Sequence, residues 1–142
     1  MFVLAYDNLD DRLGDYFADC ATEIKNSING PLLNSLIEIF GEQLNIVNID
    51  NQLSQINNSG FIFCAFSHGT TTSLNARNTS YIQYGLNTSN LRRGLTYTNA
   101  CLAGKILGKE IIDNGGRAFI GYTGEGNGIV HEDYRRISIR CD

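Results

Sequence analysis

One segment, residues 61–66 with the sequence FIFCAF, constrains the fold of this 142-residue chain more than any other. An unbroken run of apolar residues, half of them phenylalanine, favours a strand that is buried on both faces, as in the middle of a parallel sheet. Parallel neighbours are joined by crossover connections that usually contain a helix. The segment therefore predicts a sheet with a helical layer on each face.

Strand and helix patterns alternate along the rest of the chain. The alternation predicts an α/β fold, a three-layer α-β-α sandwich with a mainly parallel sheet of five or six strands. Predicted strands cover 1–6, 44–49, 61–66, 95–100 and 117–122, with a small hairpin strand at 81–84 and a candidate sixth strand at 137–141. Predicted helices cover 9–28, 32–40 and 102–114, with one or two helical turns at 51–58 and loops at 69–80 and 121–128.

Apolar spacing orients the first and last of these helices. The first has a stripe of apolar residues three or four apart, which predicts one buried face. Its members are Leu9, Leu13, Phe17, Cys20, Ile24 and Ile28. Asp7 or Asn8 could cap its start, and Asp10 and Asp11 suit the positive end of its dipole. In the last helix we expect Ile106, Leu107 and Ile111 to face inward.

Composition excludes several classes of function. The net charge is -4 and the basic residues are scattered, so the chain has no electrostatic footprint for nucleic acid. The four cysteines have no CxxC spacing, so neither a zinc site nor any cofactor is indicated, and the lack of a disulfide framework is typical of the cytoplasm. No apolar run approaches the ~20 residues of a membrane span, so no membrane partner is expected. The length fits a single domain over residues 1–142.

A histidine directly follows the strongest predicted strand. Ligands of parallel sheets bind beyond the carboxyl ends of the strands, where we expect His68 to be exposed. Its imidazole could accept and return a proton near neutral pH. Gly69 permits close backbone approach and could donate its N–H to an oxyanion. Taken alone, a His-Gly pair is more often a structural loop feature.

A cysteine follows another predicted strand. We expect Cys101 at the start of the helix over 102–114, whose positive end would favour the reactive thiolate. Taken alone, Cys101 is more often a small buried hydrophobe. If the strands before His68 and Cys101 are neighbours, both side chains reach one sheet edge, where a thiol and an imidazole could together attack a carbonyl.

Three short motifs, taken in order, resemble the caspase and gingipain clan of cysteine peptidases, which includes metacaspases, separases and bacterial CHAT proteases. They are FIFCAFSHGT, LTYTNACLAG and GRAFIGYTGE, all within residues 61–125. The resemblance implies a caspase-like fold and a cysteine endopeptidase that cleaves polypeptide substrates through an acyl-enzyme. It implies His68 as base, Cys101 as nucleophile, and the N–H groups of Gly69 and Cys101 as oxyanion hole. It implies no cofactor in the chemistry.

The same resemblance suggests substrate-binding residues. In this family the P1 pocket is partly built just after the first strand and just before the catalytic cysteine, where this chain has Asp7 and Asn99. An acid in the pocket would favour Arg or Lys at P1, as in metacaspases, although metacaspases carry an acid where this chain has Asn99. Arg77, in the loop after His68, could also reach the pocket.

The chain is short for this family, whose core usually has six strands. A domain truncated at its C-terminus, a minimal domain, and a chain whose site is completed by another domain or a partner chain are the alternatives. Two other functions remain open. One is an inactive caspase-like module that binds peptides or a regulatory partner. The other is a different α/β hydrolase or transferase, for which the sequence lacks a G-x-C-x-G elbow and a clear acidic partner for His68.

Overall fold

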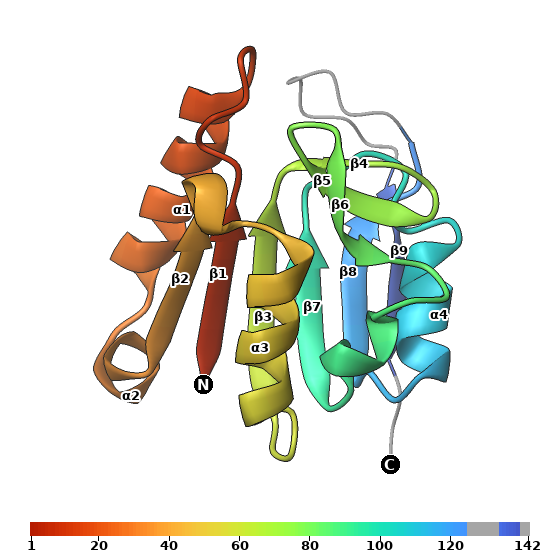
Figure 1. Ribbon diagram of the computed structural model, residues 1–142. Helices are drawn as coiled ribbons and strands as arrows, with labels where there is room; N and C mark the ends of the chain where they lie inside the picture. The colour runs from red at the N-terminus through yellow and green to blue at the C-terminus, as the bar shows by residue number, and fades with distance from the viewer. Residues whose placement is uncertain (125–133, 140–142) are drawn as a thin grey trace.

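The computed structural model describes residues 1–124 and the backbone of residues 134–139. Its centre is a six-stranded sheet of order β2-β1-β3-β7-β8-β9 (Figure 1). The first five run parallel and β9 is antiparallel to β8. The strands are β1 (Phe2–Tyr6), β2 (Leu36–Phe40), β3 (Phe61–Phe66), β7 (Gly94–Thr98), β8 (Ala118–Tyr122) and β9 (Tyr134–Ile139). The predicted α/β architecture with a mainly parallel sheet is confirmed.

The FIFCAF segment is the central strand β3, between β1 and β7. All of its residues except the half-buried Ile62 are buried, and β1 is buried along its whole length. Side chains of these strands alternate between two apolar clusters, with Val3 and Phe63 in one and Leu4 and Cys64 in the other. Both faces of the sheet centre are therefore core, as an apolar run without alternation requires.

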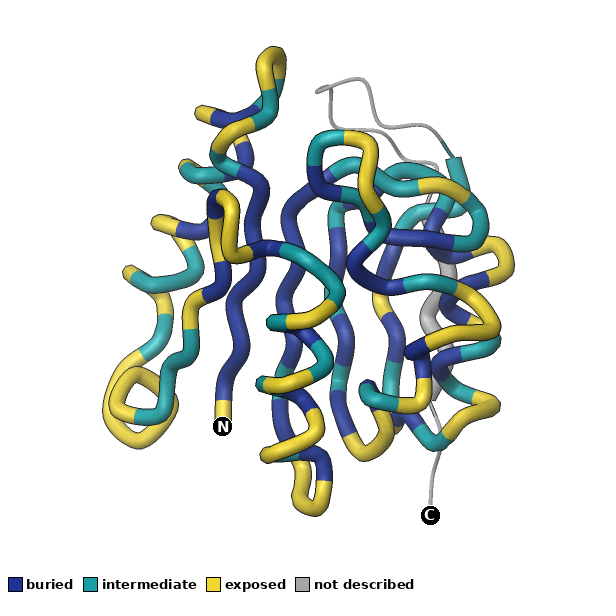
Figure 2. Tube along the Cα trace, viewed as in Figure 1, coloured by how far each residue is buried: buried dark blue, intermediate teal, exposed yellow. Residues whose placement is uncertain are grey.

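Helices cover the two faces unequally. α1 (Gly14–Ser27) packs against β1 and β3 on one face. The opposite face is covered by α3 (Ile46–Ile56), α4 (Leu107–Asp113) and the short helix η2 (Thr88–Leu91). Figure 2 shows the dark, buried strands between helices whose outer sides are exposed.

A small antiparallel sheet is inserted between β3 and β7. It consists of β4 (His68–Gly69), β5 (Ser73–Ala76) and β6 (Thr79–Gln83). Arg77 and Asn78 form the tight turn between β5 and β6, and both have positive φ, as such hairpin turns require. The loop predicted at 69–80 is therefore largely strand, whereas the hairpin strand predicted at 81–84 is confirmed within β6.

The helix predicted at 32–40 is wrong. A short helix, α2 (Gly30–Asn34), ends before this segment pairs with β1 as the strand β2. Ile37 and Ile39 pack into the core, while Glu38 between them points to the other face. Because β2 is an edge strand, this alternation with a period of two was the correct signal.

The strand predicted at 44–49 is also wrong. After the short helix η1 (Gly41–Gln43), Asn45 caps α3, because its side-chain oxygen accepts a hydrogen bond from the Asn48 N–H at 3.0 Å. Ile49 and Leu53, four residues apart, are the buried positions of α3. The helical turns predicted at 51–58 belong to this longer helix.

The remaining boundaries differ by a few residues. The first helix begins at Gly14, so Leu9 lies before it and is 45% exposed. The sixth strand exists, but β9 begins at Tyr134 and residues 140 and 141 lie outside the described residues. The loop predicted at 121–128 starts within β8, and residues 125–128 also lie outside the described residues.

Candidate functional site

His68 and Cys101 follow two adjacent parallel strands. In the pairing of β3 with β7, Ala65 lies opposite Thr98. His68 comes 68 − 65 = 3 residues after Ala65, and Cys101 comes 101 − 98 = 3 residues after Thr98. Because both residues lie three positions beyond the aligned pair Ala65 and Thr98, the segments that carry His68 and Cys101 reach the same carboxyl edge of the sheet.

The backbones of these two segments are in direct contact. A Cβ atom added to Gly69 would lie 2.7 Å from the Ala100 Cβ and 2.9 Å from the Cys101 carbonyl oxygen. Real Cβ atoms do not approach other atoms this closely, so only glycine fits here without a shift. Gly69 thus allows the segment after β3, which includes β4, to lie against the loop that carries Cys101.

The imidazole of His68 is held by a carboxylate. Its Nε2 lies 3.0 Å from Oδ1 of Asp10, a residue 58 positions away in the sequence. The His68 side chain is 44% exposed and that of Asp10 is 14% exposed. On another side, the ring packs edge-on against Phe17 of α1, with ring centroids 5.5 Å apart. Two contacts therefore fix the orientation of the ring at the rim of the sheet.

Asp10 is itself fixed by the start of α1. Its Oδ2 accepts hydrogen bonds from the backbone N–H groups of Leu13 at 2.8 Å and Arg12 at 3.1 Å. Burial opposes ionisation, but these two N–H groups and His68 outweigh it and lower the pKa of the Asp10 carboxyl below its ordinary value of 3.8. The carboxylate is thus ionised near neutral pH. Because it can only accept, the hydrogen belongs on Nε2 of His68.

The setting of Cys101 differs from the expectation in one respect. Residues 101–106 form turns, and α4 begins only at Leu107, so Cys101 is not at a helix N-terminus. Ile106, expected to face inward, is 45% exposed, whereas Leu107 and Ile111 are fully buried as expected. Leu102 has positive φ and donates its N–H to the Gly124 carbonyl at 3.0 Å, so the half-buried Cys101 sits in a loop tied to the segment after β8.

Two other described thiols are poorly suited to nucleophilic chemistry. Burial raises the pKa of Cys64 to about 12. Burial also raises the pKa of Cys20, although a hydrogen bond with Tyr16 opposes the shift. Both residues pack in or against the apolar cluster under α1, as expected of small hydrophobic residues.

Asp7 and Arg77, both predicted to bind substrate, bind each other. The Asp7 side chain is fully buried, and its Oδ1 lies 2.6 Å from Nη1 of Arg77. The Arg77 backbone N–H donates to Asp7 Oδ2 at 2.9 Å, and Nη2 donates to the Gly41 carbonyl at 3.0 Å. This pair ties the β5–β6 turn to the end of β1, and it occupies both carboxylate oxygens.

Asn99, the third predicted substrate-binding residue, lies between β7 and the Cys101 loop. It is half-buried and lies near the Tyr16 hydroxyl of α1, where it partly offsets the rise in the Tyr16 pKa that burial causes. Its Oδ1 is buried and has no hydrogen-bond partner within the part of the chain that the structure describes. The structure thus puts Asn99 beside α1, separate from the contacts between Asp7 and Arg77.

The described residues contain neither a candidate metal centre nor a helix that could cross a membrane. In residues 1–124 and 134–139, no group of three or more His, Cys, Asp or Glu side chains could hold a metal ion. No helix in that same part of the chain is long and apolar enough to span a bilayer.

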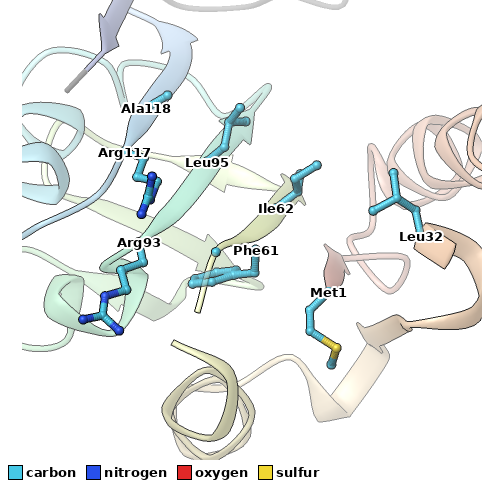
Figure 3. Close-up of a pocket in the computed structure, with 9 residues that line it drawn as sticks. Met1, Leu32, Phe61, Ile62, Arg93, Leu95, Arg117 and Ala118 are labelled. Atoms are coloured by element: carbon cyan, nitrogen blue, oxygen red, sulfur yellow. The ribbon is translucent and has the colours of Figure 1, made fainter. Parts of the chain in front are cut away.

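A pocket of about 480 Å³ lies at the amino ends of β3, β7 and β8, the edge opposite His68 and Cys101 (Figure 3).

Comparison with known proteins identifies no relative. No protein family, no curated protein and no solved structure matches the chain.

The sequence thus indicated both candidate catalytic side chains, His68 and Cys101, but not the residue that contacts His68. Asp10 was interpreted only as a favourable charge at the start of a helix. Its contact with His68 depends on the fold of the loop after β1, which has no sequence motif of its own.

Proposed function

We propose that this chain is a caspase-like cysteine peptidase in which Cys101 attacks the peptide carbonyl and His68 transfers the protons. The observation that carries the proposal is the contact between the two loops, in which Gly69 lies against Ala100 and the Cys101 carbonyl. It is supported by the carboxylate contact at His68 Nε2, which leaves Nδ1 as the ring nitrogen that can accept a proton.

The reaction follows from these groups. Nδ1 of His68 takes the proton of the Cys101 thiol, and the sulfur attacks the carbonyl carbon to give a tetrahedral oxyanion. The N–H groups of Gly69 and Cys101 are the proposed donors to that oxyanion. The imidazolium then protonates the leaving amine as the C–N bond breaks. A water molecule, deprotonated by His68, hydrolyses the resulting thioester and restores the thiol.

In this mechanism Asp10 is a positioning residue. Its carboxylate selects the His68 tautomer with hydrogen on Nε2 and stabilises the imidazolium that forms during the reaction. The reducing conditions of the cytoplasm, the proposed location, would keep the thiol available.

The choice of P1 side chain is part of the proposal. A basic P1 side chain would have to compete with Arg77 for the Asp7 carboxylate. Asn99 lies two residues before Cys101 and is half-buried, so a rotation of its side chain would bring its amide to a P1 group; its Oδ1, now buried, has no hydrogen-bond partner among the described residues. We therefore propose that Asn99 contributes to the P1 pocket, and that Arg and Lys peptides are cleaved only if they can displace Arg77.

Fluorogenic peptides with Arg, Lys, Asn or Asp at P1 test the proposal. We expect wild-type protein to cleave at least one of them, and Cys101→Ala and His68→Ala to cleave none. A peptide with an electrophilic group at its C-terminus should label Cys101 and no other thiol. No turnover and no labelling in well-folded protein would contradict the proposal. Equal peptide affinity of wild type and Cys101→Ala, without cleavage, would indicate a peptide-binding module instead.

A further inference from the structure

The sheet has a partly uncovered face on the side of α1. The main contacts of α1 are with β1 and β3, and α4 contacts β8 from the opposite face. On the α1 side, the apolar residues Ile62, Leu95 and Ala118 are only half-buried, and Ile120 is 37% exposed. Ile62 lies opposite Leu95, and Leu95 lies opposite Ala118, on three adjacent strands; together with Ile120, on the same face of β8, they form an apolar strip.

The strip ends in the pocket at the amino edge of the sheet. Ile62, Leu95 and Ala118 line it together with Phe61, Leu32 of α2 and Met1. Its volume of about 480 Å³ lies in the range of small-molecule sites, and such sites combine apolar walls with a few charged groups.

Two arginines supply the charge of this pocket. Arg93 lies directly before β7 and Arg117 directly before β8, and both are exposed. Figure 3 shows their side chains together on one side of the pocket, with Leu32 and Met1 on the other. Neither arginine forms an ion pair within the described residues, and no Asp or Glu lines the pocket. In a chain of net charge -4, this is a local concentration of positive charge that nothing described neutralises.

The guanidinium groups of Arg93 and Arg117 differ in the hydrogen bonds that they make with the described residues. Arg93 donates through Nη1 to the Asn58 carbonyl. No hydrogen bond from the Arg117 side chain to a described residue occurs, although its backbone N–H donates to the Gly94 carbonyl at 2.9 Å. Arg117 is thus the stronger candidate for direct contact with an anion, and a guanidinium favours the planar, bidentate geometry of a carboxylate.

We propose that this pocket binds a single-chain amphiphile with an anionic head group, such as a medium-chain aliphatic carboxylate. The head group contacts Arg117 and Arg93. The aliphatic chain lies along Leu95 and Ile62 toward Leu32, where it buries the apolar strip. The site is separate from His68 and Cys101, so it does not depend on the proposed peptidase activity.

Calorimetric titration with three probes that share a ten-carbon chain, each kept below its solubility limit or micelle concentration, tests this inference. The probes are decanoate, the neutral decanol and the cationic decyltrimethylammonium. We expect wild type to bind decanoate most tightly, with an affinity that falls as salt is added. Arg117→Gln should weaken decanoate binding at least ~10-fold, the effect of losing one charge-assisted contact, and should leave decanol binding nearly unchanged. Arg12→Gln, which removes an exposed arginine from the loop before α1, is the matched control and should bind like wild type.

The variant Arg117→Gln is chosen because the Arg117 side chain makes no described hydrogen bond, so its loss should leave the fold intact, as circular dichroism would show. A second variant, Arg93→Gln, should also weaken decanoate binding. No saturable decanoate binding, equal binding of the cationic probe, or unchanged binding in both variants would overturn the proposal. Binding to phosphatidylglycerol vesicles without binding of free decanoate would also overturn it, in favour of a lipid surface.

Discussion

The Asp10 carboxylate and the His68 imidazole meet at 3.0 Å, through Oδ1 and Nε2. The contact joins the loop before α1 to the strand β4 and fixes which ring nitrogen carries hydrogen. Since Oδ2 of the same carboxylate accepts two backbone N–H groups, the position of the ring is coupled to the start of α1. The proposed proton transfer therefore depends on a residue that is far from His68 in the sequence.

Replacing Asp10 by Asn should impair activity more than folding. The amide of Asn can donate to Nε2, which would move the hydrogen to Nδ1, where it blocks acceptance of the thiol proton. We expect kcat to fall by about 100-fold or more, within the range of general acid–base effects, with a smaller change in KM. Asp11→Asn, which changes the exposed neighbour in the same loop, is the control and should keep wild-type kinetics. Wild-type kinetics in Asp10→Asn would exclude the positioning role.

The lowered pKa of Asp10 predicts a pH dependence of stability. Because the folded-state pKa lies below the ordinary value of 3.8, ionised Asp10 stabilises the fold at all pH values well above 3.8. That contribution is lost as the pH falls through 3.8 and then through the folded-state pKa. The free energy of unfolding of wild type should therefore exceed that of Asp10→Asn at pH 6, and the difference should shrink toward pH 2. A difference that is constant or grows on acidification would contradict this assignment.

Gly69→Ala tests the contact between the two loops. The new methyl group would lie 2.7 Å from the Ala100 Cβ and 2.9 Å from the Cys101 carbonyl oxygen, so one loop must move. We expect a loss of stability of about 1–3 kcal/mol, as for other overpacked sites, and a loss of peptidase activity larger than the unfolded fraction explains. Gly60→Ala is the matched control, because its new Cβ would have no neighbour closer than the Arg93 carbonyl at 3.9 Å. Equal behaviour of the two variants in urea unfolding and peptide cleavage would show that the contact is unimportant.

Arg77→Ala should destabilise the fold strongly. It removes the side-chain partner of the fully buried Asp7 carboxylate and leaves a buried charge unpaired. Breaking a buried pair in this way costs about 3–5 kcal/mol, and the lower end applies here because the Arg77 side chain is 33% exposed and its backbone N–H still donates to Asp7. Urea denaturation measures the effect, with the exposed Arg12→Ala as control. If the variant remains folded, faster cleavage after Arg or Lys would support competition between Arg77 and a basic P1 side chain.

The sequence predicted those parts of the fold that have unambiguous local patterns. The FIFCAF segment became the central strand, and His68 and Cys101, the two candidate catalytic residues, follow adjacent strands. Short apolar runs were ambiguous, because LIEIF and LNIVNI fit either a strand or a helix by composition. Pairing with β1 made the first a strand, and the cap at Asn45 made the second a helix. One expected parallel strand was absent and one unexpected parallel strand was present, so the number of parallel strands was still predicted correctly.

The features of the site that were missed also depend on tertiary structure, which local sequence patterns do not reveal. His68 and Cys101 are marked by the strands that precede them, whereas the contact of Asp10 with His68 and that of Asp7 with Arg77 span 58 and 70 positions and depend on tertiary structure. The expected helix N-terminus at Cys101 was wrong because Leu102 adopts positive φ and begins a series of turns. Local pattern cannot reveal such a turn when the residue is not glycine.

The proposal that the Cys101 thiol and the His68 imidazole work as a pair can be tested by the rate at which iodoacetamide alkylates Cys101. Mass spectrometry of the Cys101 peptide at pH 7 gives this rate in wild type and in His68→Ala. We expect a rate in wild type at least ~10-fold higher than in His68→Ala, since the imidazole accepts the thiol proton. Equal rates in two well-folded proteins would contradict it.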